Sequence, residues 1–325
     1  MNYYLGIDGG GSKTLAVVTD EQGTILGRGL SGCGNHQVQV ELARSSIQQA
    51  AEEAMKQAGI TRNQLSYAMF GLAGADREAD FQVLRPMIAN MQFPVYGIVC
   101  DTEIGLRAGT RQADGVVLVC GSGTNCYGIN KQGESLQVGG FGYMFGDFGG
   151  GGELAVEVFR TVIRAWEGRE SSTLLTEAVL QTLDYPSVER LFHDYLDRGA
   201  RAPRHLTKLL FQVAEQDEAA REILQRQGRE LGKAAAAVIG KLDMMQDRFD
   251  LVLVGSVLTR GDRRFITPQI EEMIKPLAPG CRLRRLTMEP VAGAVLLAME
   301  KSGHHVEDVV YDRLNEGLSV KEEQA

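Results

Sequence analysis

The sequence predicts an α/β protein with two similar halves, the second of them enriched in helices. Strand and helix patterns alternate through the first third of the chain, whereas residues 153–242 are almost entirely helical in pattern. A strand, a tight glycine-rich turn and a second strand occur twice, at residues 5–19 and 117–129. This repeated unit predicts two halves that offer backbone N–H groups to one shared phosphate chain.

The first half is predicted to follow the order βββαβαβ. Residues 3–7, 14–19 and 24–30 have the pattern of an antiparallel meander. A helix over 41–58 should end at Gly59 and precede a buried strand over 66–72. Asp76 is expected to cap the next helix, which runs through residue 91, and a strand over 95–100 ends at Asp101.

The second glycine turn restarts the pattern after a linker over 110–115. A loop over 139–152 holds eight glycines, and helices follow, the longest over 218–242. A strand over 250–254 leads into Gly255 and Ser256, and the last core helix covers 290–301.

These patterns predict a division into domains. We expect an N-terminal domain over 1–113, with the helix at 290–301 packing back on it, and a C-terminal domain over 114–289. The charged tail, 302–325, is expected to be a peripheral helix or partly disordered.

Composition limits the classes of function. With 325 residues and 44% apolar residues, the chain can bury a full core in two domains. The net charge of −8 argues against a nucleic-acid surface. We find neither a signal peptide nor an apolar run of about 18 residues that would suggest a membrane helix. Five scattered cysteines without a C-x-x-C pair favour reduced thiols, so a cytoplasmic protein is expected.

The first glycine turn does not match the common phosphate loops. A Walker A sequence has lysine directly after its last glycine, whereas here Ser12 separates Gly11 from Lys13. Residues 14–19 are alternating and β-branched, so a strand follows where a P-loop would enter a helix. No G-x-G-x-x-G sequence opens a helix, which disfavours a dinucleotide-binding fold.

The motifs together resemble the sugar kinase/heat-shock protein/actin superfamily. They are the Asp-Gly-Gly-Gly hairpin at 8–11, the Gly-Ser-Gly-Thr turn at 121–124 and the Val-Gly-Ser turn at 254–256. Residues 6–14 resemble the BadF/BadG/BcrA/BcrD ATPase family. Segments 34–36, 121–126, 139–147 and 254–257 are similar to its N-acetylglucosamine kinase branch.

The resemblance extends from Leu5 to about Met299. It implies two actin-like (ribonuclease H-like) domains with a cleft between them, ATP as co-substrate, Mg²⁺, and by analogy a homodimer.

The first turn provides the expected metal and phosphate contacts. Asp8 is expected to bind the Mg²⁺ that bridges nucleotide phosphates, or alternatively to accept backbone hydrogen bonds in an Asx turn. The resemblance assigns Ser12 to an ATP phosphate, with Gly10 and Gly11 in the same nucleotide-binding turn. Lys13 either adds positive charge there or is a solvated hairpin lysine.

Asp101 is the expected general base. It follows an apolar strand, which places it at the sheet edge where such folds bind ligands. Phosphorylation of a sugar hydroxyl needs a carboxylate that orients it and accepts its proton. The resemblance places the family's catalytic aspartate here, and a helix N-cap is the compatible alternative.

The loops are expected to hold the sugar. Asn35 and Asp147 are predicted sugar contacts, with ordinary turn residues as the alternative. The resemblance adds four further sugar-binding residues: Thr124, Asn125, Gly140 and Phe141. The chain departs from the kinase branch at Phe148, where an acidic residue is usual, and at the four glycines that follow it. The identity of the sugar therefore stays open.

The remaining nucleotide contacts come from the second half. By resemblance, Ser122 faces ATP, and Gly255 with Ser256 faces the nucleoside. Gly228, inside the long helix, is expected to lie close to adenine, with helix packing as the alternative.

The expected function is an ATP-dependent kinase that phosphorylates an amino sugar, foremost N-acetylglucosamine at its 6-position. Glucosamine and N-acetylmuramate are alternative acceptors. An alternative from another class is an ATPase that activates an acyl-CoA dehydratase or reductase, which needs cysteine ligands for an iron–sulfur cluster. A transcriptional regulator is disfavoured because the sequence leaves no room for a helix-turn-helix before Tyr3.

Overall fold

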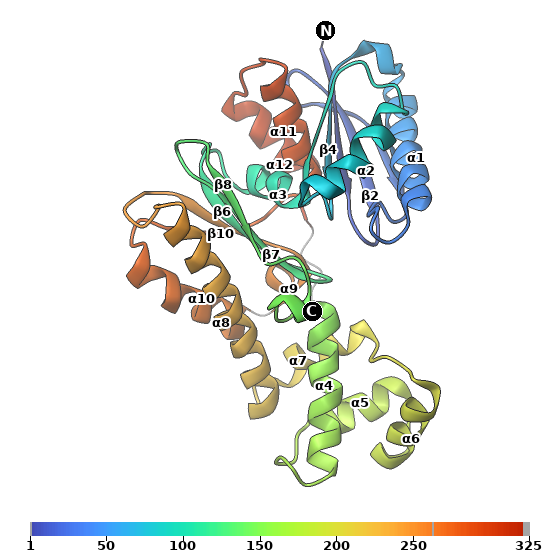
Figure 1. Cartoon of the computed structure of the whole chain (residues 1–325), viewed down its shortest axis with the longest axis vertical. Helices are drawn as coiled ribbons and strands as arrows, with labels where there is room; N and C mark the ends of the chain where they lie inside the picture. The colour runs from blue at the N-terminus through green and yellow to red at the C-terminus, as the bar shows by residue number, and fades with distance from the viewer. Residues whose placement is uncertain (1, 262, 321–325) are drawn as a thin grey trace.

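Two five-stranded sheets form the framework of the protein (Figure 1). The computed structural model describes residues 2–261 and 263–320. The strand orders are β3-β2-β1-β4-β5 and β8-β7-β6-β9-β10. In each sheet, three antiparallel strands are followed by two parallel ones. The two sheets therefore share one topology, and the predicted α/β fold with two similar halves is confirmed.

The first half follows the predicted order βββαβαβ. Its elements are β1 (Tyr3–Gly9), β2 (Thr14–Asp20), β3 (Ile25–Ser31), α1 (Val40–Ala58), β4 (Leu65–Leu72), α2 (Glu78–Ala89), β5 (Tyr96–Cys100) and α3 (Asp101–Gly109), with a 3₁₀ turn at Arg62–Gln64. Helix α1 ends as predicted, because Gly59 adopts a left-handed φ of 66°.

The predicted cap of α2 is wrong. The helix begins after Arg77 as N-cap, and Asp80, in its first turn, accepts a hydrogen bond from the Arg77 backbone N–H at 3.0 Å. Asp80 thereby supplies the capping that we expected from Asp76. The Asp76 side chain lies instead against Cys100.

The second half contains β6 to β10 and α4 to α10. Its elements are β6 (Gly115–Cys120), β7 (Thr124–Ile129), β8 (Ser135–Val138), α4 (Gly151–Trp166), α5 (Leu175–Leu183), α6 (Val188–Arg198), α7 (Thr207–Val213), α8 (Glu218–Lys241), β9 (Asp250–Val254), α9 (Ser256–Thr259), α10 (Arg263–Leu277) and β10 (Arg282–Arg285), with 3₁₀ turns at Tyr143–Phe145 and Arg204–Leu206. The predicted helical stretch is thus confirmed.

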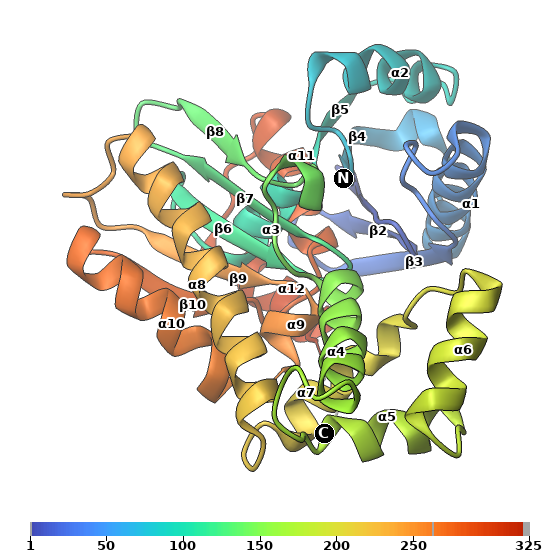
Figure 2. The same cartoon turned by 60° about the horizontal axis from the view of Figure 1, so that its bottom comes forward.

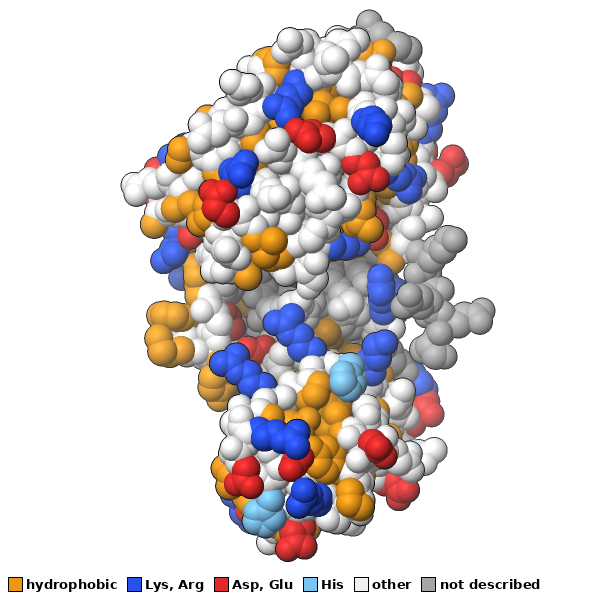
Figure 3. Space-filling model, turned by 90° about the vertical axis from the view of Figure 1, so that its right-hand side faces the viewer, with side chains coloured by type: hydrophobic (Ala, Val, Ile, Leu, Met, Phe, Trp, Pro, Cys, Tyr) orange, Lys and Arg blue, Asp and Glu red, His pale blue; other side chains and the backbone are white. Residues whose placement is uncertain are grey.

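Helices α4 to α7 project from the second sheet as a separate lobe (Figures 1 and 2). On one face of the molecule, a hollow lies between this lobe and the part of the molecule above it in the view (Figure 3). Helix α8 packs on β6, β7 and β8 and against α10. Among the described residues, no helix has both the length and the apolar character needed to cross a membrane.

Helix α11 (Val291–Lys301) returns to the first sheet and lies between β1 and α3. The approach is close, since a Cβ atom at Gly6 would lie 2.7 Å from the Val295 backbone nitrogen. A Cβ atom at Gly293 would lie 1.8 Å from the Ile104 carbonyl oxygen. The helix backbone therefore fits between two other backbones without a layer of side chains.

The tail forms α12 (Asp308–Gly317), and residues 321–325 lie outside the described residues. Val310, Leu314 and Leu318 are buried and extend the core that lies between the two sheets. This helix packs on the core, whereas we expected the tail to be a peripheral helix or partly disordered. The division of the chain into domains at residue 113 stays a prediction.

Candidate active site

The carboxyl ends of three parallel strands meet at one edge of the first sheet. In the strand register, Gly9 is paired with Leu72, and Leu72 with Cys100. Asp8 therefore lies one residue before this row, and Asp101 one residue after it. Ligands of open α/β sheets bind at such an edge.

Two loops are tied to the first glycine turn. The Ala73 N–H donates to the Gly9 carbonyl oxygen, and the Gly34 N–H donates to the Gly10 carbonyl oxygen, both at 2.9 Å. These bonds fix the segments that carry Asp76 and Asn35 beside the turn. The two loops that follow β3 and β4 are thus attached to the turn between β1 and β2.

The electrostatics of this edge are dominated by carboxylates. The pKa of Asp8 is raised to about 7, chiefly by burial, with the negative charges of Asp101 and Glu289 adding to the rise and Lys13 opposing it. Burial also raises the pKa of Asp101, partly offset by a hydrogen bond from Cys100. Lys13 Nζ lies 3.2 Å from Glu289 Oε2, so this cation is already paired. A divalent cation would relieve the repulsion between the carboxylates.

These residues fit Mg²⁺ in one particular way. Among residues 2–261 and 263–320, no group of three His, Cys, Asp or Glu side chains forms a metal cage. Mg²⁺ usually takes one or two protein carboxylates and completes its shell with water and phosphate oxygens. Asp8, half-buried and reluctant to ionise without a counter-charge, suits that role.

Cys100 connects two carboxylates at this edge. Its Sγ lies 3.2 Å from Asp76 Oδ1 and 3.3 Å from Asp101 Oδ1. Burial and the charges of Asp101 and Asp76 hold the pKa of this thiol well above its usual value, so the sulfur keeps its proton. It can therefore donate a hydrogen bond to a carboxylate.

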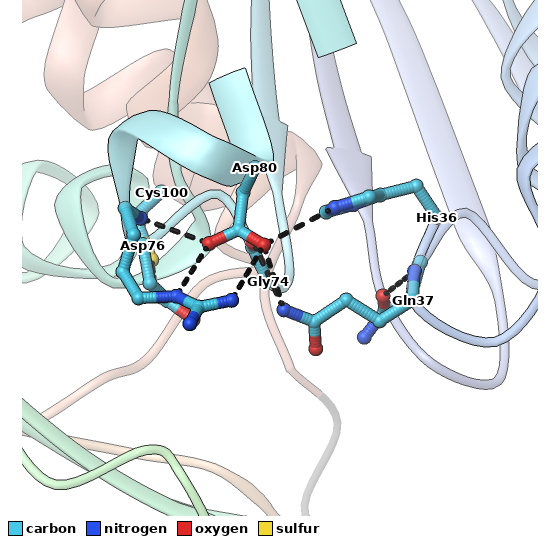
Figure 4. A network of polar contacts seen from close by, with 8 residues as sticks. His36, Gln37, Gly74, Asp76, Asp80 and Cys100 are labelled. Atoms are coloured by element: carbon cyan, nitrogen blue, oxygen red, sulfur yellow. Dashed lines mark hydrogen bonds and ion pairs between the residues drawn. The ribbon is translucent and has the colours of Figure 1, made fainter. Parts of the chain in front are cut away.

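Asp80 holds the Asn35 loop in place (Figure 4). Its carboxylate accepts hydrogen bonds from Gln37 Nε2 at 3.2 Å and from the Arg77 guanidinium, and it lies 3.5 Å from His36 Nε2. Asn35 Oδ1 accepts a hydrogen bond from the Gln37 N–H at 2.8 Å, which is the turn geometry that we kept as an alternative. Asn35 thus has a fixed orientation, and its contact with sugar stays a prediction.

The second sheet forms its own edge from glycines. Val119 is paired with Val254, so the turn at 121–123 and Gly255 follow adjacent parallel strands. Gly255 has a φ of 93°, and a Cβ atom there would lie 2.4 Å from the Cys120 carbonyl oxygen. The Gly151 N–H, in the first turn of α4, donates to the Gly121 carbonyl oxygen at 2.7 Å.

This second edge suits an anion. Helix α4 begins at the glycine turn, where its dipole favours negative charge, although the N–H groups of Gly151 and Gly152 already donate to carbonyl oxygens of the turn. Ser122 and Ser256 are exposed here, as is Ser12 at the first turn. These hydroxyl groups are thus accessible, while their phosphate and nucleoside contacts stay predictions.

Gly228 is buried where α8 crosses α10. A Cβ atom there would lie 2.4 Å from the Ile266 carbonyl oxygen. Helix packing, the alternative kept for this residue, is therefore sufficient to account for a glycine. Its contact with adenine remains a prediction.

The glycine-rich loop over 139–152 borders a cavity of about 250 Å³. Thr124, Asn125, Gly139 and Asp147 line it together with residues of α8. Gly140 packs on the Asn125 side chain, whose buried Oδ1 has no hydrogen-bond partner among the described residues.

Asp147 stabilises this loop from within. Its Oδ2 accepts hydrogen bonds from the N–H groups of Phe141 at 2.7 Å and Gly142 at 2.6 Å. Phe148 is turned inward under the Arg226 guanidinium. The Phe141 ring, by contrast, is 43% exposed.

Four residues of the first edge escaped the sequence analysis as site residues: Asp76, Asp80, Cys100 and Glu289. Glu289 and Lys13 are 276 residues apart in the chain, and no local pattern joins them. The Glu289 N–H donates to the Leu318 carbonyl oxygen at 2.8 Å, so the tail holds this segment. No sequence signal indicated Asp80, because arginine is not a typical N-cap residue and Arg-x-x-Asp is not the usual capping-box sequence.

Comparison with known proteins agrees with this geometry. The N-acetylmuramic acid/N-acetylglucosamine kinase of Clostridium acetobutylicum is 27% identical over 304 residues, which cover 92% of this chain and 98% of the relative. The N-acetyl-D-glucosamine kinase of Dictyostelium discoideum is 28% identical over 312 residues, 91% of this chain and 97% of the relative.

A solved structure from Chromobacterium violaceum, described as a candidate N-acetylglucosamine kinase, matches with a TM-score of 0.70 at 22% identity. It covers 92% of this chain and 99% of that one, which shows that the actin-like fold is shared. The chain belongs to the BadF/BadG/BcrA/BcrD ATPase family, whose sequence model matches residues 5–298.

Proposed function

We propose that the protein is an ATP-dependent kinase that transfers the γ-phosphate to a hydroxyl group of an amino sugar, foremost the 6-hydroxyl of N-acetylglucosamine. The observation that carries the proposal is the pairing of two unlike sheet edges. One edge presents Asp8 and Asp101, and the other presents a glycine turn at the N-terminus of α4. The kinase names of two relatives that cover over nine-tenths of the chain support it.

Asp101 acts as the general base in this proposal. Its carboxylate accepts a hydrogen bond from the sugar hydroxyl and takes its proton as the oxygen attacks the γ-phosphorus. The new O–P bond forms while the bond to the β–γ bridging oxygen breaks, and ADP leaves with that electron pair. The raised pKa of Asp101 suits a proton acceptor, because it strengthens the base.

Asp8 would hold Mg²⁺, directly or through water, together with phosphate oxygens. The metal ion supplies positive charge that neutralises the phosphates as charge develops in the transition state. Asp8 must lose its proton to bind the ion, and Lys13 favours that ionisation. Ser12 and Ser122 would donate hydrogen bonds to phosphate oxygens from the two turns.

The sugar would lie between the Asn35 loop and the glycine-rich loop. Asn125 Oδ1, buried without a partner among the described residues, would accept a hydrogen bond from the sugar. Phe141 would cover one face of the ring, and Thr124 and Asp147 would bind polar substituents.

A coupled assay of ADP release over a panel of sugars tests the proposal. We expect N-acetylglucosamine to stimulate ADP release most, followed by N-acetylmuramate and glucosamine. Phosphorus NMR of the product identifies the phosphorylated hydroxyl group. If no amino sugar raises ADP release above the basal rate in the presence of Mg²⁺, the proposal fails.

The proposal includes two further expectations, a homodimer and a cytoplasmic location. Light scattering coupled to size-exclusion chromatography tests whether the protein is a homodimer. A visible absorbance band after anaerobic iron–sulfur reconstitution would instead favour the activating ATPase.

A further inference from the structure

The Cys100 side chain lies between two carboxylates that come from different strands. Asp76 follows β4 and Asp101 follows β5, and the Cys100 sulfur is within 3.3 Å of an oxygen of each. Both carboxylates are half-buried, and the cysteine is 4% exposed. Figure 4 shows the Asp76 and Cys100 side chains together at the start of α2.

A buried thiol in contact with two half-buried carboxylates needs a defined proton arrangement. The thiol keeps its proton, since burial and both carboxylates oppose its ionisation. It therefore has one hydrogen to donate and two acceptors within reach. A bond from the thiol to Oδ1 of Asp101 restrains the rotation of that carboxylate, and Asp76 can compete for the same hydrogen.

From this geometry we propose that Cys100 and Asp76 are positioning residues for Asp101, and that the thiol sets the orientation in which this carboxylate meets the substrate hydroxyl. The inference rests on the proposed kinase function. It assigns roles to two residues that touch neither sugar nor nucleotide in the proposal. Their effect on the reaction passes through Asp101 alone.

The two residues act on Asp101 in opposite directions. The thiol stabilises the ionised carboxylate by donating to it, which lowers the pKa of Asp101. The negative charge of Asp76 disfavours that ionised form and raises the pKa. Asp101 in turn acts on Asp8 of β1, whose pKa it raises, and Lys13 and Glu289 act on Asp8 as well.

The experiment compares kcat, KM and pH profiles of four variants with those of the unaltered protein, with saturating Mg²⁺ and ATP. In Cys100→Ala, we expect kcat to fall by about threefold to tenfold at an unchanged KM for sugar. Cys100→Ser, whose hydroxyl can donate the same bond, should restore kcat to within about twofold. Cys126→Ala is the matched control, because Cys126 is a fully buried cysteine on β7 whose raised thiol pKa is due to burial alone.

The pH profile supplies a readout that a purely structural role would not move. The acidic limb of kcat/KM should shift to higher pH in Cys100→Ala, where a stabilising donor is lost. It should shift to lower pH in Asp76→Asn, where a repelling charge is lost. Cys126→Ala should leave the limb in place.

The inference is overturned if Cys100→Ala, folded by circular dichroism, matches Cys126→Ala in kcat and in its pH profile. It is also overturned if the two site variants shift the acidic limb in the same direction. Either result leaves the kinase proposal intact, because that proposal fails only if the unaltered protein shows no sugar-dependent release of ADP.

Discussion

The two glycine turns share a topology and differ in their surroundings. The turn after β1 is surrounded by ionisable side chains, with Asp8 before it, Lys13 within it and Asp101 at the end of β5, two strands away in the sheet. The turn after β6 is enclosed by backbone, since Gly150 and Gly255 both lie against it. In the proposed kinase, the first half would supply the proton and metal chemistry, and the second half would supply an anion site made of peptide groups.

The largest expected effect on activity comes from Asp101, at the carboxyl edge of the first sheet. Asp101→Asn retains the shape of the side chain and removes its basicity, so kcat should fall by about 10²- to 10⁴-fold in the coupled ADP assay. Asp197→Asn, an exposed aspartate on α6, is the control and should be unaffected. Full activity in Asp101→Asn would remove the base assignment.

A side chain that displaces the glycine turn after β6 should weaken ATP binding. A Cβ atom at Gly150 would lie 2.5 Å from the Gly123 Cα, so Gly150→Ala should displace the turn and raise the KM for ATP about tenfold or more. Gly133→Ala is the matched control, because Gly133 has a similar φ of 81° with nothing within 4 Å of its Cβ position. Equal KM values in the two variants would show that the turn tolerates displacement.

A smaller effect concerns the pH dependence of stability. Because the folded pKa of Asp8 is raised from 3.8 to about 7, its contribution to stability is present at low pH and lost as pH rises through 7. Without Mg²⁺ at pH 8, Asp8→Asn should therefore be more stable than the unaltered protein by about 1–2 kcal/mol. The difference should vanish near pH 3, where Asp8 is largely protonated in both the folded and the unfolded chain. Urea unfolding at both pH values measures it, and a constant difference would contradict the raised pKa.

The smallest effect belongs to the Lys13–Glu289 pair. The Lys13 side chain is 53% exposed, so a double-mutant cycle with Lys13→Met and Glu289→Gln should give a coupling below about 1 kcal/mol. Added salt should reduce it further. A larger coupling that resists salt would mean that the first turn is held as rigidly as the second.

The sequence was sufficient where local pattern determines structure. The order βββαβαβ, the β9 strand and the end of α1 at Gly59 all follow from short-range periodicity and one left-handed residue. Placement of Asp8 and Asp101 at one edge followed from the rule for parallel strands. The sequence of the tail also contains a signal for a packed helix, because the apolar residues Val310, Leu314 and Leu318 repeat at helical spacing.

The sequence was insufficient where a residue acts through tertiary contact. Cys100 and Asp76 are 24 residues apart, and their meeting depends on the pairing of β4 with β5. The error at Asp76 had a different cause. Aspartate is a common N-cap residue, which favoured Asp76, whereas the helix begins after Arg77 and its capping box is completed by Asp80.

The close packing of α11 on β1 has a consequence for folding during synthesis on the ribosome. Gly6 on β1 contacts Val295 without any intervening side chain, so the surface of the first sheet that α11 covers has no partner until nearly the whole chain exists. At ordinary rates of translation, this leaves the β1 surface without its partner helix for about 15 to 60 seconds after it emerges. The N-terminal strands must therefore wait on the ribosome in an incomplete state, and a chain that stalls before residue 291 would expose that apolar surface to chaperones and proteases.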